Sequence, residues 1–196
     1  MQRSILATAA SVLALSACSA PPPANDEEAL ARARACDTPE SAEIPLADAP
    51  EEAGDAEANA AAAEAYLETV RTGRCVFELE NGLVFRIRDA VEDGPSPERG
   101  DLVTVHYRGL FPHGDEFDSS YARGEPATFP SDRLIRGWVE ALPLMRVGET
   151  WELYIPPALG YGERGTGPIG PNQALVFQLE LIDLPGHEDE DSDGDG

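Results

Sequence analysis

The stretch LIRGWVEAL, residues 134–142, decides the fold class, because it is the one apolar run between residues 81 and 186 that has helical spacing. Its apolar side chains recur at intervals of three and four residues, which is the period of a helix face. Pro143 ends the pattern, and Gly137 inside it makes the helix intrinsically weak, so packing must hold the helix in place. The apolar positions are Leu134, Ile135, Trp138, Val139 and Leu142.

The segments around this stretch alternate apolar and polar residues, which predicts strands with one buried face. Glycine and proline residues separate the alternating runs. Several strands, one amphipathic helix and no βαβ alternation predict an α+β domain. We expect an antiparallel sheet of about five strands wrapped around the short helix. The apolar faces comprise Leu83, Phe85 and Ile87; Val103, Val105 and Tyr107; Trp151, Leu153 and Ile155; and Leu175, Phe177, Leu179 and Leu181.

Composition divides the remainder of the chain. Residues 81–186 form the predicted domain, and residues 55–80 supply an Ala-rich helix and a lead-in to the first strand. Residues 18–54 are rich in Ala, Pro, Asp and Glu, which predicts a flexible tether with a short helix near residues 27–36. Residues 187–196 form an acidic tail that we expect to be disordered.

The first 17 residues are predicted to be an export signal. Arg3 precedes an apolar run that is too short to span a bilayer, and the run ends in Leu-Ser-Ala-Cys at residues 15–18. This ending resembles the lipobox of bacterial lipoproteins, whose cysteine carries the lipid. The alternative is an ordinary secretory signal that is cleaved nearby, for instance after Ala17 or Ala20.

The cysteines are consistent with an exported lipoprotein. Lipidation of Cys18 would leave Cys36 and Cys75, and exported proteins fold in oxidising surroundings. We therefore hypothesise a Cys36–Cys75 disulfide that joins the N-terminal segment to the start of the domain. By resemblance to Gram-negative lipoproteins, Ser19 directly after the lipidated residue favours the outer membrane, with the protein facing the periplasm.

The net charge and the contexts of two motifs argue against nucleic-acid binding, dinucleotide binding and calcium binding. The chain has 37 acidic and 14 basic residues, a net charge of −23, whereas nucleic-acid binding requires clustered basic residues. The glycine-rich string at 160–165 precedes Gly and Pro residues, and not the helix that a dinucleotide site needs. The acidic string at 189–194 lacks the closing glutamate of an EF-hand loop. We therefore expect no nucleic-acid partner, no metal and no cofactor.

Four strings in the predicted domain resemble the family of FKBP-type peptidyl-prolyl cis-trans isomerases, in that family's order and with matching spacing apart from local loop changes. The runs at 161–165 and 167–172 are most similar to its Mip-like bacterial branch. The resemblance implies the FKBP form of the α+β fold. The strings are VTVHYRG at 103–109, GDEFDSS at 114–120, LIRGW at 134–138, and GYG at 160–162, which leads to LVF at 175–177.

The resemblance implies that the protein accelerates rotation about X-Pro bonds in proline-containing polypeptides. Amide resonance opposes this rotation with a barrier of about 18–20 kcal/mol. A dry apolar pocket favours the twisted amide, in which charge separation is lower, without a covalent step.

Residue roles are carried over from the same resemblance. Trp138 would be the pocket floor, the Ile135 N–H and the Tyr161 hydroxyl would donate to substrate carbonyls, and Asp118 would orient the substrate or a neighbouring tyrosine. The catalytic set is Tyr107, Asp118, Tyr161 and Ile135, and the substrate-binding set is Phe117, Arg123, Phe129, Leu134, Trp138, Ile169 and Phe177.

Other interpretations stay open from the sequence. Trp138 and Phe177 could be ordinary core residues, and Asp118 could be a turn residue. The domain could be a prolyl-peptide-binding or chaperone module with little turnover, or a structural envelope lipoprotein. Macrolide inhibitors are further candidate ligands, although Ala127 stands where an aromatic often lines the pocket of small macrolide-binding relatives. The Ala-rich helix is shorter than the dimerisation arm of many Mip-like proteins, which favours a monomer.

Overall fold

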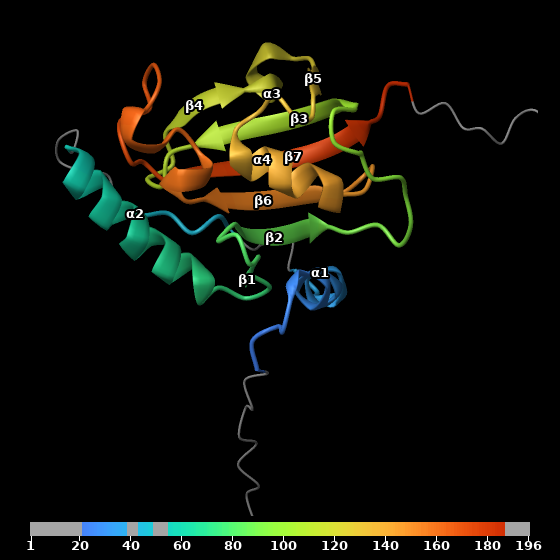
Figure 1. Ribbon diagram of the computed structural model, residues 1–196, viewed down its shortest axis with the longest axis horizontal. Coiled ribbons are helices and arrows are strands. Elements are labelled where there is room, and N and C mark those ends of the chain that lie inside the picture. Colours follow the sequence, from blue (N-terminus) through green and yellow to red (C-terminus); the bar gives the residue numbers. More distant parts are fainter. Residues whose placement is uncertain (1–20, 39–42, 49–54, 187–196) are drawn as a thin grey trace, which may run out of the picture.

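The computed structural model describes residues 21–38, 43–48 and 55–186 (Figure 1). The export signal, Cys18 and the acidic tail lie outside these residues, so the predictions for them stay predictions. Within the described ranges, no helix has both the length and the apolar character that crossing a bilayer requires.

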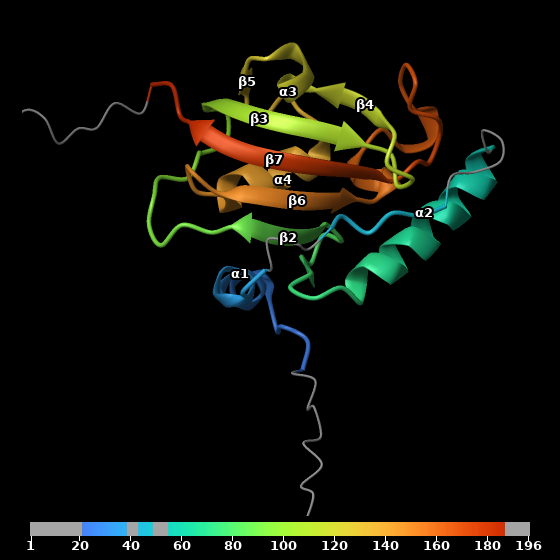
Figure 2. The ribbon, with the colours of Figure 1, turned by 180° about the vertical axis from the view of Figure 1, so that it is seen from behind.

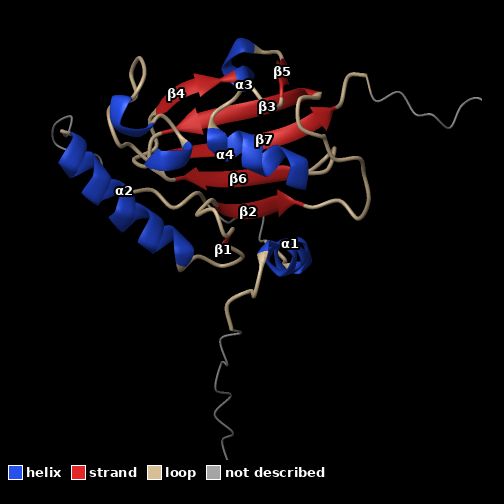
Figure 3. Cartoon of the chain, in the orientation of Figure 1, coloured by secondary structure: helices blue, strands red, loops and turns tan. Residues whose placement is uncertain are grey.

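An antiparallel seven-stranded sheet forms the centre of the molecule (Figure 3). The strand order is β1-β2-β6-β7-β3-β4, and β5 pairs with β3 off this path. The α+β prediction is confirmed, but the strands outnumber the expected five because β1 and β5 are too short to show alternation. The strands are β1 (Phe77–Glu78), β2 (Val84–Asp89), β3 (Leu102–Leu110), β4 (Glu116–Ser119), β5 (Ala127–Pro130), β6 (Thr150–Ile155) and β7 (Leu175–Asp183).

Helix α4 (Arg136–Ala141) lies across one face of the sheet (Figure 1), and the strands lie in front of it when the molecule is seen from behind (Figure 2). It begins later than the predicted helix because the backbone of its N-cap, Ile135, is extended. The short 3-10 helix η1 (Leu142–Leu144) follows it and contains Pro143. Gly137 lets α4 approach the sheet closely, since a Cβ there would lie 2.8 Å from Cδ1 of Ile155.

A different helix packs on each face of the sheet. Phe85, Leu153 and Phe177 belong to the same apolar cluster as Trp138 of α4. Their strand neighbours Val84, Tyr154 and Val176 point the other way and pack with helix α2 (Ala56–Arg71). The strands form where the alternation predicted them, but the prediction of a single buried face is wrong for β6, which is buried at every position because side chains pack on both faces of the sheet there. Three further short helices lie in loops, namely α3 (Ser120–Arg123), η2 (Pro157–Leu159) and η3 (Gly162–Arg164).

The N-terminal segment differs from the predicted flexible tether. Helix α1 (Asp26–Ala35), close to the helix expected there, packs against β1 and β2 and buries Ala29 and Ala33. Residues 43–48 also lie on the domain, where the Tyr66 hydroxyl donates to the carbonyl of Pro45 at 2.8 Å. Small side chains explain the difference, because alanine lets a helix of low hydropathy approach a sheet edge without contributing a strong apolar signal.

Two contacts attach α1 to the domain. Arg34 donates from Nε to Oε1 of Glu149 at 2.8 Å, and the Glu149 side chain is fully buried. Glu149 also accepts hydrogen bonds from the Trp151 indole and the Arg146 backbone. Directly after α1, a disulfide joins Cys36 to Cys75, whose Cα atoms are 5.7 Å apart.

Candidate active site

A cleft of about 460 Å³ opens between α4 and the strands β3, β4, β5 and β7. Six of its lining residues are aromatic, and they come from segments spread over 70 positions of the chain. The residues that line it are Tyr107, Phe117, Asp118, Phe129, Arg133, Leu134, Ile135, Trp138, Tyr161 and Phe177.

Aromatic rings in edge-to-face contact form the apolar part of the cleft. Trp138 is 4% exposed, and its ring lies 5.2 Å from those of both Tyr107 and Phe177, at 80° and 81°. Phe117 meets Phe177 at 5.5 Å and 87°. Such pairs are favoured by the ring quadrupoles and hold each ring in one orientation. Gly109 makes room for them, since a Cβ there would lie 2.7 Å from Phe117 and 2.8 Å from Phe177.

One carboxylate at the cleft is fixed by two neighbours. The Tyr107 hydroxyl donates to Oδ2 of Asp118 at 2.6 Å, and Nη1 of Arg123 donates to Oδ1 at 2.5 Å. Arg123 also donates from Nη2 to the Tyr107 hydroxyl at 2.7 Å, which closes a three-membered network. Both oxygens of Asp118 therefore have defined directions, and its charge is balanced by a guanidinium.

The network shifts the pKa of each member in the direction that keeps the carboxylate charged. Burial alone would raise the pKa of Asp118, but the hydrogen bonds from Tyr107 and Arg123 outweigh burial and lower it. Burial, followed by the hydrogen bond to Asp118, raises the pKa of Tyr107. Burial, followed by the charge of Asp118, raises the pKa of Tyr161. At neutral pH the site thus has one carboxylate and two neutral phenols.

Besides the indole N–H of Trp138, two hydrogen-bond donors at the cleft have no acceptor within the described residues. One is the backbone N–H of Ile135, the N-cap of α4, which takes part in no backbone hydrogen bond. The other is the hydroxyl of Tyr161, whose side chain is 38% exposed. The indole N–H of Trp138 is also buried without a partner in this part of the chain. These donors surround an apolar surface, which suits a ligand with carbonyl oxygens and an apolar ring.

The structure brings together most of the residues that were predicted for the site. Arg123 does not line the cleft but contacts it through Asp118 and Tyr107. Ile169 belongs to the same apolar cluster as Trp138 and is not among the residues that line the cleft, so its predicted contact with substrate stays a prediction. Backbone hydrogen bonds in both directions between Thr166 and Ile169 close a tight turn there. Sequence reasoning missed Arg133, whose only signal was its place directly before Leu134.

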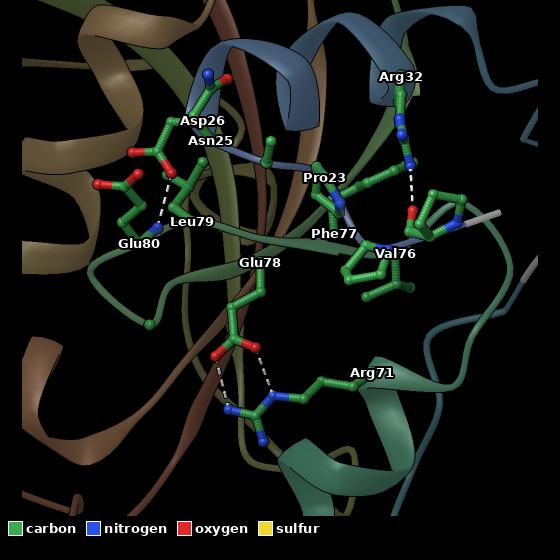
Figure 4. A pocket seen from close by; sticks show the side chains of 14 residues that line it. Pro23, Asn25, Asp26, Arg32, Arg71, Val76, Phe77, Glu78, Leu79 and Glu80 are labelled. Carbon is green, nitrogen blue, oxygen red and sulfur yellow. Dashed lines mark hydrogen bonds and ion pairs between the residues drawn. The ribbon is translucent and has the colours of Figure 1, made fainter.

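A larger cavity, of about 810 Å³, lies between the N-terminal segment and β1 (Figure 4). Four of its five charged lining side chains bind one another or the backbone. Arg71 forms a two-bond ion pair with Glu78, Asp26 accepts from the Glu80 backbone, and Arg32 donates to the Pro21 carbonyl. We assign no catalytic role to this cavity, because most of its charged groups are used in contacts that hold the N-terminal segment and α2 in place.

Comparisons with known proteins agree with this geometry. The family model of the FKBP-type peptidyl-prolyl cis-trans isomerase matches residues 94–182. The peptidyl-prolyl cis-trans isomerase Mip of Coxiella burnetii is 47% identical over 127 residues, which are 64% of this chain and 55% of the relative. The outer membrane protein MIP of Legionella longbeachae is 43% identical over 130 residues, 66% of this chain and 55% of the relative. The chain thus spans little more than half the length of these curated relatives.

A solved structure extends the agreement to the fold. The peptidyl-prolyl cis-trans isomerase of Pseudomonas syringae superposes with a TM-score of 0.61 at 34% sequence identity, over 70% of this chain and 98% of the other. The chain therefore belongs to the family of FKBP-type peptidyl-prolyl cis-trans isomerases, in its Mip-like bacterial branch.

Proposed function

We propose that the protein is a peptidyl-prolyl cis-trans isomerase that accelerates X-Pro rotation in folding proteins of the cell envelope. The observation that carries this proposal is the combination of an aromatic floor with two unpaired donors. Trp138 offers a ring-sized apolar surface, and the Ile135 N–H and Tyr161 hydroxyl lie at the same cleft with no acceptor in the part of the chain that the structure describes. A proline ring with its two flanking carbonyls matches this arrangement.

The cleft would act by binding the twisted amide better than the planar one. In the planar state, resonance places partial charges on the amide oxygen and nitrogen, and a low-dielectric surface solvates these charges poorly. Rotation removes the resonance and reduces the charge separation, so the aromatic walls penalise the twisted amide less. The two donors would keep the flanking carbonyls in place while the bond turns. The mechanism requires no nucleophile.

Asp118 would act through electrostatics and orientation. Its carboxylate is fixed by Tyr107 and Arg123 at the cleft wall, so it presents a constant field to a bound peptide. It also keeps the Tyr107 hydroxyl directed away from the apolar floor. A tyrosine hydroxyl that turned toward the floor would place a polar, hydrated group on the apolar surface where the proline ring is expected to lie.

The test is the cis-to-trans rate of short X-Pro peptides with protein from Ser19 onward. The unmodified protein should accelerate the reaction, and Asp118→Ala should reduce the acceleration. Asp115→Ala is the matched control, because Asp115 is an exposed carboxylate on the same hairpin and does not line the cleft. A folded protein that binds prolyl peptides and suppresses client aggregation, yet accelerates none, would favour the binding or chaperone module instead.

For localisation, we propose an exported protein that is anchored by a lipid on Cys18 and faces the periplasm from the outer membrane. The lipobox-like ending at residues 15–18, the disulfide and the similarity to a relative named an outer membrane protein support this placement. Fractionation of cells that express Cys18→Ser is the test. The variant should leave the membrane fraction, and unchanged membrane retention would contradict the lipid anchor.

A monomer and macrolide binding are further parts of this proposal. The short α2, which is occupied in packing on the sheet, supports the monomer. Sedimentation of the protein from Ser19 onward would test it, and a dimer would contradict it. The aromatic cleft supports binding of a macrolide. Adding increasing amounts of a macrolide inhibitor to the isomerase assay would test this binding.

A further inference from the structure

Arg133 is a charged residue on the cleft to which the proposed mechanism gives no role. It lies in the loop between β5 and α4, two positions before Ile135, and it lines the cleft. Its side chain is exposed, and its guanidinium has no hydrogen-bond or ion-pair partner within the described residues. Only its backbone is engaged, since the Arg133 N–H donates to the Pro130 carbonyl.

The other charges of the cleft cancel. Asp118 is the only other charged lining residue, and Arg123 forms an ion pair with it. The neighbouring carboxylate Asp132 does not pair with Arg133, and one of its oxygens lies toward Gly100, 3.9 Å from where a Cβ would be. The cleft therefore has one uncompensated positive charge, at its rim.

This local charge opposes the charge of the whole molecule. The net charge of −23 would repel acidic peptides at long range. At physiological ionic strength the screening length is about 8 Å, so a peptide in the cleft responds mainly to charges that it nearly touches. The charge of Arg133 thus dominates for a bound substrate, whereas the distant acidic surface is screened.

We propose that Arg133 is a specificity-determining residue that favours substrates with an acidic side chain next to the proline. The proposal rests on the proposed isomerase function and specifies its substrate class. A glutamate or aspartate that flanks the proline would form a solvent-exposed ion pair with the guanidinium while the proline ring lies on Trp138. A lysine in the same position would be disfavoured.

The experiment compares blocked tetrapeptides that differ in one residue, with Glu, Gln or Lys directly before the proline in one series and directly after it in another. NMR exchange spectroscopy measures kcat/KM at 0.15 M salt. In at least one series the Glu:Gln ratio should be about twofold to fivefold higher for the unmodified protein than for Arg133→Gln, the range that one exposed ion pair supports. Arg133→Glu should reverse the order of the Glu and Lys peptides.

A matched variant separates the local effect from net charge. Arg74→Gln removes the same charge from an exposed position between α2 and β1, outside the cleft, and should keep the ratio of the unmodified protein. Raising the salt to 0.5 M should reduce the ratio of the unmodified protein toward that of Arg133→Gln. Equal ratios for the unmodified protein and Arg133→Gln in both series would overturn the inference.

The same data distinguish this failure from failure of the proposed function. If the unmodified protein accelerates the Gln peptides but its Glu:Gln ratio does not depend on Arg133, the isomerase stands and the specificity role falls. If it accelerates none of the peptides while folded, the proposed function itself falls, and the specificity inference falls with it.

Discussion

Arg34 and Glu149 are 115 positions apart in the sequence, and their side chains form an ion pair in which the carboxylate is fully buried. The pair joins α1 to the loop before β6. Two further donors, from Trp151 and Arg146, complete the surroundings of Glu149. A helix that composition assigns to a tether is thereby part of the folded domain.

Replacement of Arg34 by methionine should lower the free energy of unfolding by about 1–3 kcal/mol. Removing one partner of a fully buried pair costs about 3–5 kcal/mol, and partial exposure of Arg34 together with the remaining donors reduces this cost. Urea denaturation measures the change. Arg32→Met on the same helix is the control, because it breaks an exposed pair with Glu28 and should cost less than about 0.5 kcal/mol. Equal losses of stability in Arg34→Met and Arg32→Met would contradict a structural role for the ion pair between Arg34 and Glu149.

The Cys36–Cys75 disulfide should contribute about 3–4 kcal/mol to stability, the chain-entropy value for a closed loop of 39 residues. Protein from Ser19 onward should contain no free thiol before reduction. The double substitution Cys36→Ser/Cys75→Ser should lower the midpoint of denaturation with the fold retained at low temperature. Detection of two thiols in the native oxidised protein would contradict the pairing.

Removal of the Tyr161 hydroxyl should lower catalysis with little change in stability, because that hydroxyl has no hydrogen-bond partner among residues 21–38, 43–48 and 55–186. Tyr161→Phe is therefore expected to decrease kcat/KM, with a thermal midpoint close to that of the unmodified protein. Tyr121→Phe is the matched control, since the Tyr121 hydroxyl donates to Glu180 away from the cleft. A large fall in the midpoint for Tyr161→Phe would instead assign the residue a structural role.

Gly109→Ala should disturb the cleft and leave the sheet in place. The added Cβ would approach the rings of Phe117 and Phe177 to less than 3 Å, so one ring must move. Overpacking of this kind typically costs about 1–3 kcal/mol. We expect reduced isomerase activity, a lower melting temperature and an unchanged far-UV circular dichroism spectrum. Full activity would show that the positions of these rings do not limit catalysis.

The pH dependence of stability should report the depressed pKa of Asp118. A carboxyl group whose folded pKa lies below its unfolded value contributes stability that is present above the unfolded value and lost as pH falls through the folded one. The stability difference between the unmodified protein and Asp118→Asn should therefore be constant from about pH 7 to pH 5 and shrink below the ordinary value of 3.8. A difference that already fades near pH 6 would indicate a raised pKa.

The cleft residues could be predicted from the sequence where a motif that resembles the FKBP family lies on a segment with a regular apolar period. Trp138, Phe177 and Tyr107 lie on a helix or a strand. The period of that element fixes the direction of each side chain once the strands are paired into a sheet. The direction of the Ile169 side chain could not be predicted, because this residue lies in a tight turn, where neither the helix period nor the strand period applies. Arg133 lies in a loop and carried no pattern at all. Residues on loops need the tertiary structure before a role can be assigned.

The docking of α1 could not be predicted because its determinants are distant in sequence. Composition identified the helix, but its apolar contacts are made by alanines, and its anchor Glu149 is indistinguishable in sequence from an exposed glutamate. The hydropathy of a short segment does not reveal contacts with residues that are distant in the sequence. A buried carboxylate is recognisable once its partners, Arg34, Arg146 and Trp151, are placed around it.

The disulfide has a consequence for the integrity of the chain. Every peptide bond between Cys36 and Cys75 lies inside a covalent loop. A single proteolytic cut in that loop would leave one molecule, in which α1 stays bonded to the FKBP-type domain. A chain with serine at both positions would separate into two fragments after the same cut. An enzyme tethered through its N-terminus would thus survive a nick that otherwise detaches it from its membrane.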